Sequence, residues 1–166
     1  MTGLFRLLTT AALLAPAGIA KAEMPGAIAL PAARTIATVH AEGAQVYECK
    51  AEAGGNLAWH FREPIATLFI GGNTIGRHYA GPSWEFADGS VVTAKAAARA
   101  PGATAKDIPL LKLSVTAHRG SGQLTTVTAI QRLNTQGGTL EGACERPGAM
   151  MSVPYAADYT FLQEPN

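Results

Sequence analysis

The chain has 166 residues, which suggests one domain, and its 13 Lys and Arg residues nearly balance its 12 Asp and Glu residues. A chain this close to neutral lacks the electrostatic footprint of a protein that binds nucleic acid or an anionic membrane surface. We therefore expect no nucleic-acid partner, which leaves a small molecule, a glycan or another protein.

Residues 1–22 resemble a secretory signal peptide. Arg6 supplies the positive charge, residues 7–14 the apolar stretch, and Ala-Lys-Ala at 20–22 matches a small-x-small cleavage pattern. A membrane anchor is disfavoured because the apolar run is well short of the roughly 20 residues that span a bilayer. Removing Arg6 and Lys21 changes the formal net charge from +1 to −1. We expect an exported protein, periplasmic or secreted, with no integral membrane segment after cleavage.

The first elements of the mature chain are predicted from composition and alternation. Residues 23–34 are rich in Ala and Pro and are interpreted as an extended lead-in to a single β domain at 35–166. Strands are expected at 35–39, 45–51 and 57–62, where apolar and polar side chains alternate.

The strand at 57–62 has the clearest pair of faces. Leu57, Trp59 and Phe61 share the face that we expect in the core, and His60 on the other face is interpreted as a solvated or cross-strand residue. Pro64 is predicted to end the strand, because proline cannot donate to a central ladder.

Glycine-rich turns organise the rest of the chain into further short strands. The remaining expected elements are strands at 67–70, 74–79, 85–87 and 91–97, a loop at 98–107, strands at 111–118 and 123–133, a turn at 134–138, an irregular segment at 141–148, and a strand at 155–162. Roughly nine or ten short strands without a convincing helix predict an all-β fold. The expected architecture is an antiparallel β-sandwich or a small β-barrel.

The only two cysteines are Cys49 and Cys144. An even pair in an exported protein predicts a disulfide, with two buried free thiols as the alternative. Closing a loop of about 100 residues would contribute about 4–5 kcal/mol in the chain-entropy model. Neither cysteine has a close Cys or His partner, so we expect no metal site.

Residues 76–85, Gly-Arg-His-Tyr-Ala-Gly-Pro-Ser-Trp-Glu, hold the densest group of functional side chains in the chain. An imidazole and a carboxylate offer acid/base capacity, and aromatic faces suit sugars and other flat ligands. The candidate binding residues in this stretch are His78, Tyr79, Trp84 and Glu85.

The same stretch also has a structural interpretation. The two aromatic side chains could cap the β core, and Arg77 could pair with Glu85 across the Gly-Pro bend between them. Arg132 and Asp158 are the other polar candidates for binding, and each could equally be half of a structural ion pair.

Several segments together resemble one family of exported proteins. They are residues 46–49, 59–64, 76–85, 88–90, 130–132, 135–138 and 153–159, of which the His-Tyr-Ala-Gly-Pro-x-Trp-Glu run is the most specific. Their order and spacing are similar to those of the domain of unknown function 3455 family, from about Ala44 to Phe161. The chain departs from the family pattern at Leu110, where the family favours Trp, and at Glu145, where it favours Asp. The resemblance implies no activity, substrate or cofactor.

Three functional hypotheses follow. The preferred one is an exported, non-catalytic module that binds a small molecule or glycan, without a cofactor. The second is an exported enzyme that uses His78 and Glu85 as acid/base groups, although G-x-S-x-G, H-E-x-x-H and G-x-G-x-x-G motifs are absent from the sequence. The third is an interaction protein that inhibits a secreted or periplasmic enzyme, suggested by the Tyr-x-Cys strand at Tyr47 and Cys49.

Overall fold

The computed structural model describes residues 24–165, and it is all-β as expected. The predicted signal peptide at 1–22 lies outside the described residues. The elements are the one-turn 3-10 helix η1 (Gly26–Ile28), β1 (Arg34–Ala51), β2 (Leu57–Ile70), β3 (Asn73–Tyr79), β4 (Ser83–Phe86), β5 (Val91–Ala100), β6 (Leu110–Arg119), the 3-10 turn η2 (Gln123–Thr126), β7 (Ala129–Gly137) and β8 (Met150–Gln163). In this part of the chain, neither short helix is long and apolar enough to cross a bilayer.

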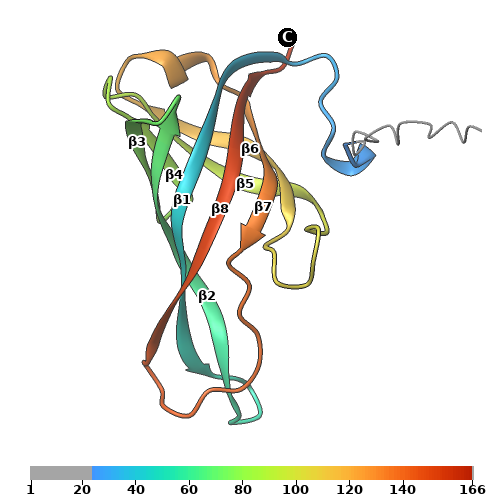
Figure 1. The fold of residues 1–166 in the computed structure, drawn as a ribbon, viewed down its shortest axis with the longest axis vertical. Coiled ribbons are helices and arrows are strands. Elements are labelled where there is room, and N and C mark those ends of the chain that lie inside the picture. Colours follow the sequence, from blue (N-terminus) through green and yellow to red (C-terminus); the bar gives the residue numbers. More distant parts are fainter. Residues whose placement is uncertain (1–23, 166) are drawn as a thin grey trace, which may run out of the picture.

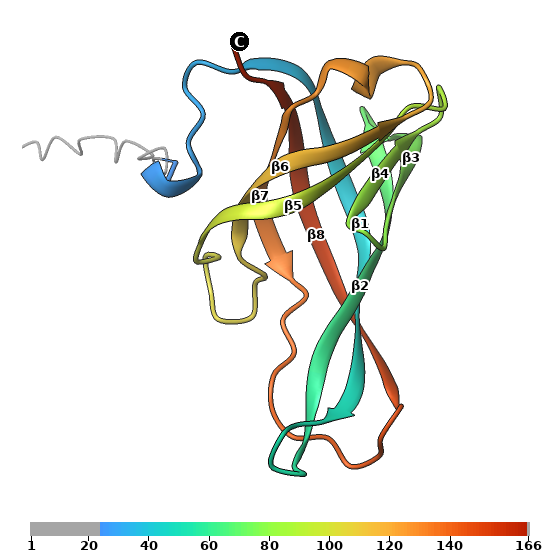
Figure 2. The same cartoon turned by 180° about the vertical axis from the view of Figure 1, so that it is seen from behind.

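The eight strands form one closed antiparallel ring. Each strand pairs with the next along the chain, and β1 also pairs with β8, which closes the sheet. Figures 1 and 2 show this ring from opposite sides. Of the two architectures that the sequence predicts, the barrel is confirmed. Closure pairs the first strand with the last, so the barrel section has no free edge, whereas β2 and β8 each pair on one side only where they extend beyond it.

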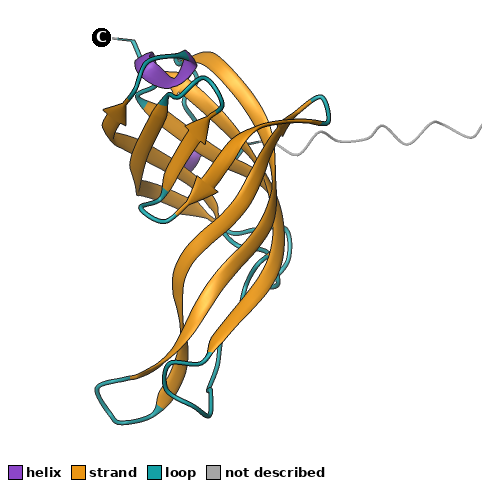
Figure 3. Cartoon of the chain, turned by 90° about the vertical axis from the view of Figure 1, so that its left-hand side faces the viewer, coloured by secondary structure: helices purple, strands orange, loops and turns teal. Residues whose placement is uncertain are grey.

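The barrel is uneven because its strands differ greatly in length. β1 has 18 residues and β2 and β8 have 14 each, whereas β3 has 7 and β4 has 4. The three long strands run well past the others as a twisted arm (Figures 1 and 3). The predicted disulfide between Cys49 and Cys144 is present and ties the irregular segment 141–148 to this arm.

The strand count is lower than predicted because adjacent predicted strands merge. Pro64 does not end a strand: it lies inside β2, opposite Gln45. At that position β2 pairs only with β1, since β3 joins β2 from Ala66 onward. Proline lacks an N–H, so it is tolerated where one side of the strand has no ladder to serve. Pro154 in β8 follows the same rule, because pairing with β7 ends at Tyr155.

The predicted strand at 123–133 and turn at 134–138 are also revised. The first part forms η2, and β7 begins at Ala129 and continues through the predicted turn. The register between β7 and β8 shifts between Leu133 and Gln136, where Asn134 has a φ of 50°. The turn-forming residues therefore make an irregularity within a strand, because β8 continues alongside and keeps the chain paired.

The inward-facing side chains of the barrel are buried, whereas the face of the arm that the sequence predicts to be core is partly exposed. Tyr155, Ala157, Tyr159 and Phe161, which share one face of β8, are all buried. Phe61 was predicted to be core but is 54% exposed. It lies on the section of β2 that precedes the pairing with β3, so β1 is its only neighbouring strand there and one side of β2 is open.

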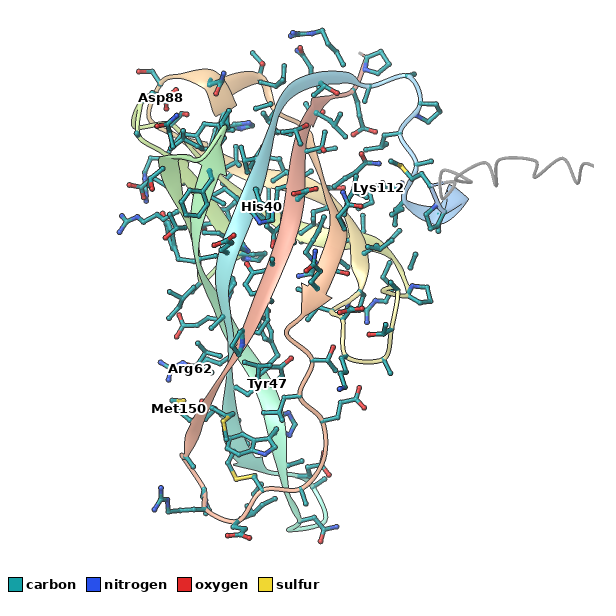
Figure 4. The ribbon with its side chains drawn as sticks, in the orientation of Figure 1. His40, Tyr47, Arg62, Asp88, Lys112 and Met150 are labelled. Atoms are coloured by element: carbon teal, nitrogen blue, oxygen red, sulfur yellow. A yellow bond between two sulfur atoms is a disulfide. The ribbon has the colours of Figure 1, made fainter. Side chains whose placement is uncertain are left out.

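One end of the barrel is closed by a plug. Leu124 of η2 and Val127 are fully buried in the main core cluster. Asp88 holds this plug in place: its carboxylate accepts hydrogen bonds from the backbone N–H of Gln123 at 2.7 Å and from Ser90. These bonds lower the pKa of Asp88, with the Ser90 hydroxyl as the largest cause. Figure 4 places Asp88 at the end of the barrel away from the arm.

The lead-in is docked on the barrel. The η1 turn lies against β5 and β6, and Ile28 is fully buried. The side chain of Gln131, also buried, donates a hydrogen bond to the carbonyl oxygen of Ile28 at 2.6 Å. A buried amide that finds this partner avoids the penalty of an unsatisfied polar group.

Candidate functional site

The β3–β4 hairpin divides the cluster at 76–85 between two faces of the sheet. Its register pairs Arg77 with Glu85 and His78 with Trp84. Paired residues share a face and neighbours along a strand alternate, so these two pairs point to opposite sides. The bend between the strands contains Gly81 with a φ of 133°, a conformation that favours glycine.

Inside the barrel, three rings form a compact aromatic cluster. His78 is 3% exposed and stacks on Trp84, which is 1% exposed, with ring centroids 4.2 Å apart and planes 10° apart. Tyr159 meets both rings edge-on, at 5.1 Å from His78 and 5.2 Å from Trp84. Such contacts fix ring orientation beyond what apolar burial provides.

His78 is neutral in the folded protein. Burial is the main reason that its pKa falls to about 3; the charge of Arg132 also lowers it, and the hydrogen bond to Ser83 opposes the change. Nδ1 lies 2.8 Å from the carbonyl oxygen of Ser83 and must donate, because a carbonyl only accepts. Nε2 therefore carries the lone pair, so this nitrogen can accept a hydrogen bond but has no proton to donate at neutral pH.

Outside the barrel, the predicted pairing of Arg77 with Glu85 is confirmed. Arg77 Nη2 donates to both carboxylate oxygens, at 3.0 and 3.1 Å, and the Tyr79 hydroxyl donates to Glu85 Oε2 at 3.0 Å. These two hydrogen bonds, the one from Arg77 being the larger cause, lower the pKa of Glu85. Tyr79 and Glu85 thus lie on the outer surface, on the opposite face of the sheet from His78 and Trp84.

Arg132 and Asp158 are likewise on different faces. Arg132 faces Tyr159 across β7 and β8, and its Nε donates to the carbonyl oxygen of Pro109 at 3.0 Å. Asp158 lies beside His40, whose Nδ1 is 2.8 Å away, and accepts a bond from Asn134 at 2.7 Å. Asp158 therefore holds the irregular part of β7 in place from outside.

A cavity of about 580 Å³ lies below the aromatic cluster. His78, Trp84 and Arg132 are the three predicted site residues that line it, together with residues that the sequence analysis did not select. The other polar side chains of the wall are Gln45, Tyr47, Arg62, Arg99 and Tyr159. Tyr47 and Arg62 lie toward the arm, away from the plug (Figure 4), so this end of the barrel forms the mouth. Alternation along β1 puts Gln45 and Tyr47 on one face, which was the available signal for these two residues, but closure of the sheet decided which cavity they face.

The cavity wall has positive but no negative side chains. Arg62, Arg99 and Arg132 line it, and no Asp or Glu does. Arg62 pairs with Glu63 at 3.2 Å, whereas within residues 24–165 neither Arg99 nor Arg132 forms an ion pair. The described residues also contain no group of His, Cys, Asp and Glu that could hold a metal ion.

The fold and cavity define a closed, disulfide-linked all-β barrel with an aromatic, positively charged interior pocket. The chain belongs to the family described as "Protein of unknown function (DUF3455)", whose model matches residues 31–163. The match covers all eight strands, including the predicted family segments. Comparisons with curated proteins and with solved structures return no match.

Proposed function

We propose that this protein is a non-catalytic binding module that holds a small molecule in the barrel interior. The observation that carries the proposal is the cavity of about 580 Å³. It falls within the range of roughly 300–1,000 Å³ typical of small-molecule sites. The hydrogen-bonded strands around it are a rigid scaffold, so a ligand would meet a largely pre-formed site.

The wall offers the mixture that orients a small ligand. The buried His78 and Trp84 rings form an aromatic part of the wall, and Arg132 and Tyr47 contribute polar groups. A wall that combines aromatic and polar groups suits small molecules and glycan fragments, so both belong in a ligand screen.

The enzyme hypothesis has less support from the geometry. His78 is inside the barrel and Glu85 is outside, bound to Arg77. A general acid and base that cooperate must both reach the reacting groups within hydrogen-bond distance. The sheet between these two side chains opposes that arrangement.

An inhibitor-like interaction through Tyr47 also lacks a specific observation in its favour. The Tyr47 hydroxyl donates to the carbonyl oxygen of Gly138 at 2.7 Å, and its ring packs against Phe61 at 5.8 Å. Tyr47 is buried, so a protein partner would not meet it on the surface.

We propose further that the protein is exported to the periplasm or secreted. The Cys49–Cys144 disulfide supports an oxidising compartment. Mass spectrometry of the protein recovered from cell fractions should give a mature chain that begins at Glu23 and has an oxidised cysteine pair. Recovery of only the full-length, reduced chain from the cytoplasm would contradict export.

A cavity-blocking variant tests the binding proposal. Ala96 is an exposed residue on the cavity wall, and the neighbouring Ala97 is exposed but not on the wall. Small aromatic compounds, fatty acids and oligosaccharides should be screened by thermal shift, and hits measured by calorimetry. Ala96→Trp should weaken a hit at least tenfold, while Ala97→Trp should bind it like the wild type. Equal binding by both variants, or no hit in any class, would overturn the proposal.

A further inference from the structure

We propose that the cavity takes a small amphipathic carboxylate, with its anionic group on Arg132 and its apolar body along the β6 side of the wall. The inference rests on the proposed binding function and adds the chemical class of the ligand. The proposed ligand is therefore anionic, in contrast to a neutral glycan or a neutral small molecule.

Arg132 is a positioned cation without a protein anion. Its Nε donates to the carbonyl oxygen of Pro109 at 3.0 Å, which orients the guanidinium on the cavity wall, and its charge also interacts with the Tyr159 hydroxyl. The side chain is only partly exposed, and no carboxylate within the described range pairs with it. A partly desolvated charge is unfavourable unless it is paired, so a ligand carboxylate would relieve that penalty.

Arg132 lines the cavity, and its charge reaches several buried side chains of the barrel. Its charge lowers the pKa of His78 and opposes the burial that raises the pKa of Tyr47, Tyr155 and Tyr159. Four buried side chains from three strands thus lie near one guanidinium. A field of this kind attracts an anion into the interior and disfavours a cation.

The wall also holds buried donors that no protein group satisfies. Gln45 Nε2 and Trp84 Nε1 are buried and lack a hydrogen-bond partner within residues 24–165. Most buried polar groups in proteins have a partner, so two exceptions on the wall of one cavity are informative. Each can donate to an oxygen, and a carboxylate offers acceptors only.

The rest of the wall fits an apolar body. Ile108, Leu111 and Leu113 line one side, and Pro64 and Pro82 line other parts of the cavity. Arg99 is exposed on the wall and unpaired in the described structure, which places a second positive charge where a ligand would enter. An anionic head with a hydrocarbon or aromatic body matches both parts of the wall.

Three probes with the same chain length and a negative, neutral or positive head group test which charge the cavity prefers. Decanoate, decanol and decyltrimethylammonium should be titrated by calorimetry at pH 7.5, below the concentrations at which they form micelles. Wild-type protein should bind decanoate at least tenfold more tightly than decanol, and decyltrimethylammonium most weakly. Ala96→Trp should weaken decanoate binding, which places the probe in the cavity.

Substitutions at Arg132 then test the anchoring residue. Arg132→Gln should bind decanoate and decanol equally, and Arg132→Lys should keep a reduced preference for decanoate. Arg146→Gln, at an exposed residue of the segment 141–148, should leave the wild-type preference intact. Circular dichroism confirms folding of each variant. If wild-type protein binds decanol as tightly as decanoate, or if Arg132→Gln keeps the preference, the carboxylate assignment is wrong while the binding function stands. If no probe and no screened compound binds, both proposals fail.

Discussion

His78 is a residue whose chemistry is set by its position in the fold. It is buried against Trp84 and Tyr159, and its Nδ1 proton is used by the carbonyl oxygen of Ser83. Protonating Nε2 would place a charge in this interior beside Arg132, so the pKa falls to about 3. In the unfolded chain the same ring titrates near its ordinary value of about 6.5. Acid therefore favours the unfolded state through this one residue.

The expected consequence is a stability loss between pH 6.5 and pH 3. A folded pKa below the unfolded one means that the unfolded state binds the extra proton in this window, so the stabilisation is complete above pH 6.5 and lost as pH falls. The slope is about 1.4 kcal/mol per pH unit, or about 2 kcal/mol between pH 7 and pH 5. Urea unfolding at the two pH values measures it. His78→Gln should lose this part of the dependence, and an unchanged slope in that variant would contradict the assignment.

At the scale of the strands, two glycines permit close approach where the sheet bends. An added Cβ at Gly43 would lie 2.0 Å from the carbonyl oxygen of Ile65, and at Gly76 it would lie 2.1 Å from that of Glu85. Both obstacles are backbone atoms on the paired strand, so no side-chain rotation relieves them. Glycine inside a strand commonly marks such a close approach. Both positions are therefore dictated by the neighbouring strand rather than by a turn.

Replacing Gly76 by alanine should destabilise the protein by about 2–3 kcal/mol, in the range of overpacked interiors. Gly26→Ala is the matched control, because a Cβ there meets nothing within 4 Å. The control should change the free energy of unfolding by less than about 0.5 kcal/mol, as surface substitutions usually do. Chemical denaturation of both variants gives the comparison. Equal stability of the two variants would show that β3 and β4 separate at little cost.

At the scale of the whole molecule, the arm depends on a covalent tie. Cys49 lies on β1, and Cys144 lies in the segment between β7 and β8. Backbone bonds reinforce the contact, since Cys49 N–H donates to Ala149 at 2.9 Å and Cys144 N–H donates to Leu57 at 3.1 Å. The disulfide closes a separation of 95 residues, which restricts the unfolded chain strongly.

Removing this bridge should lower stability by about 2–5 kcal/mol. The Cys49→Ala/Cys144→Ala double variant and the reduced wild type should unfold at similar denaturant concentrations, both below the oxidised protein. Dithiothreitol should leave the double variant unchanged, which controls for other effects of the reductant. A double variant as stable as the oxidised wild type would mean that native contacts alone hold the arm.

The candidate site was only partly predictable from local sequence. Alternation along the chain separates His78 from Tyr79, but it does not say which of them faces the interior. The Gly-Pro bend identifies a hairpin, and the pairing of Arg77 with Glu85 follows from it. That Arg132, distant in sequence, joins His78 and Trp84 at one cavity depends on closure of the ring. No local sequence pattern predicts that these three residues line the same cavity.

The sequence by itself determined the all-β class, the disulfide pair and the family, because strand periodicity, cysteine count and motif order are local properties of the chain. Tertiary structure decided the rest. Pro64 and Pro154 continue through strands because the neighbouring ladder ends beside them, and Phe61 is exposed because no strand packs across the arm. The division of one polar cluster into an inner aromatic stack and an outer ion pair likewise required the register of β3 and β4 and the closure of the sheet. Burial depends on which strands meet, and distant segments decide that.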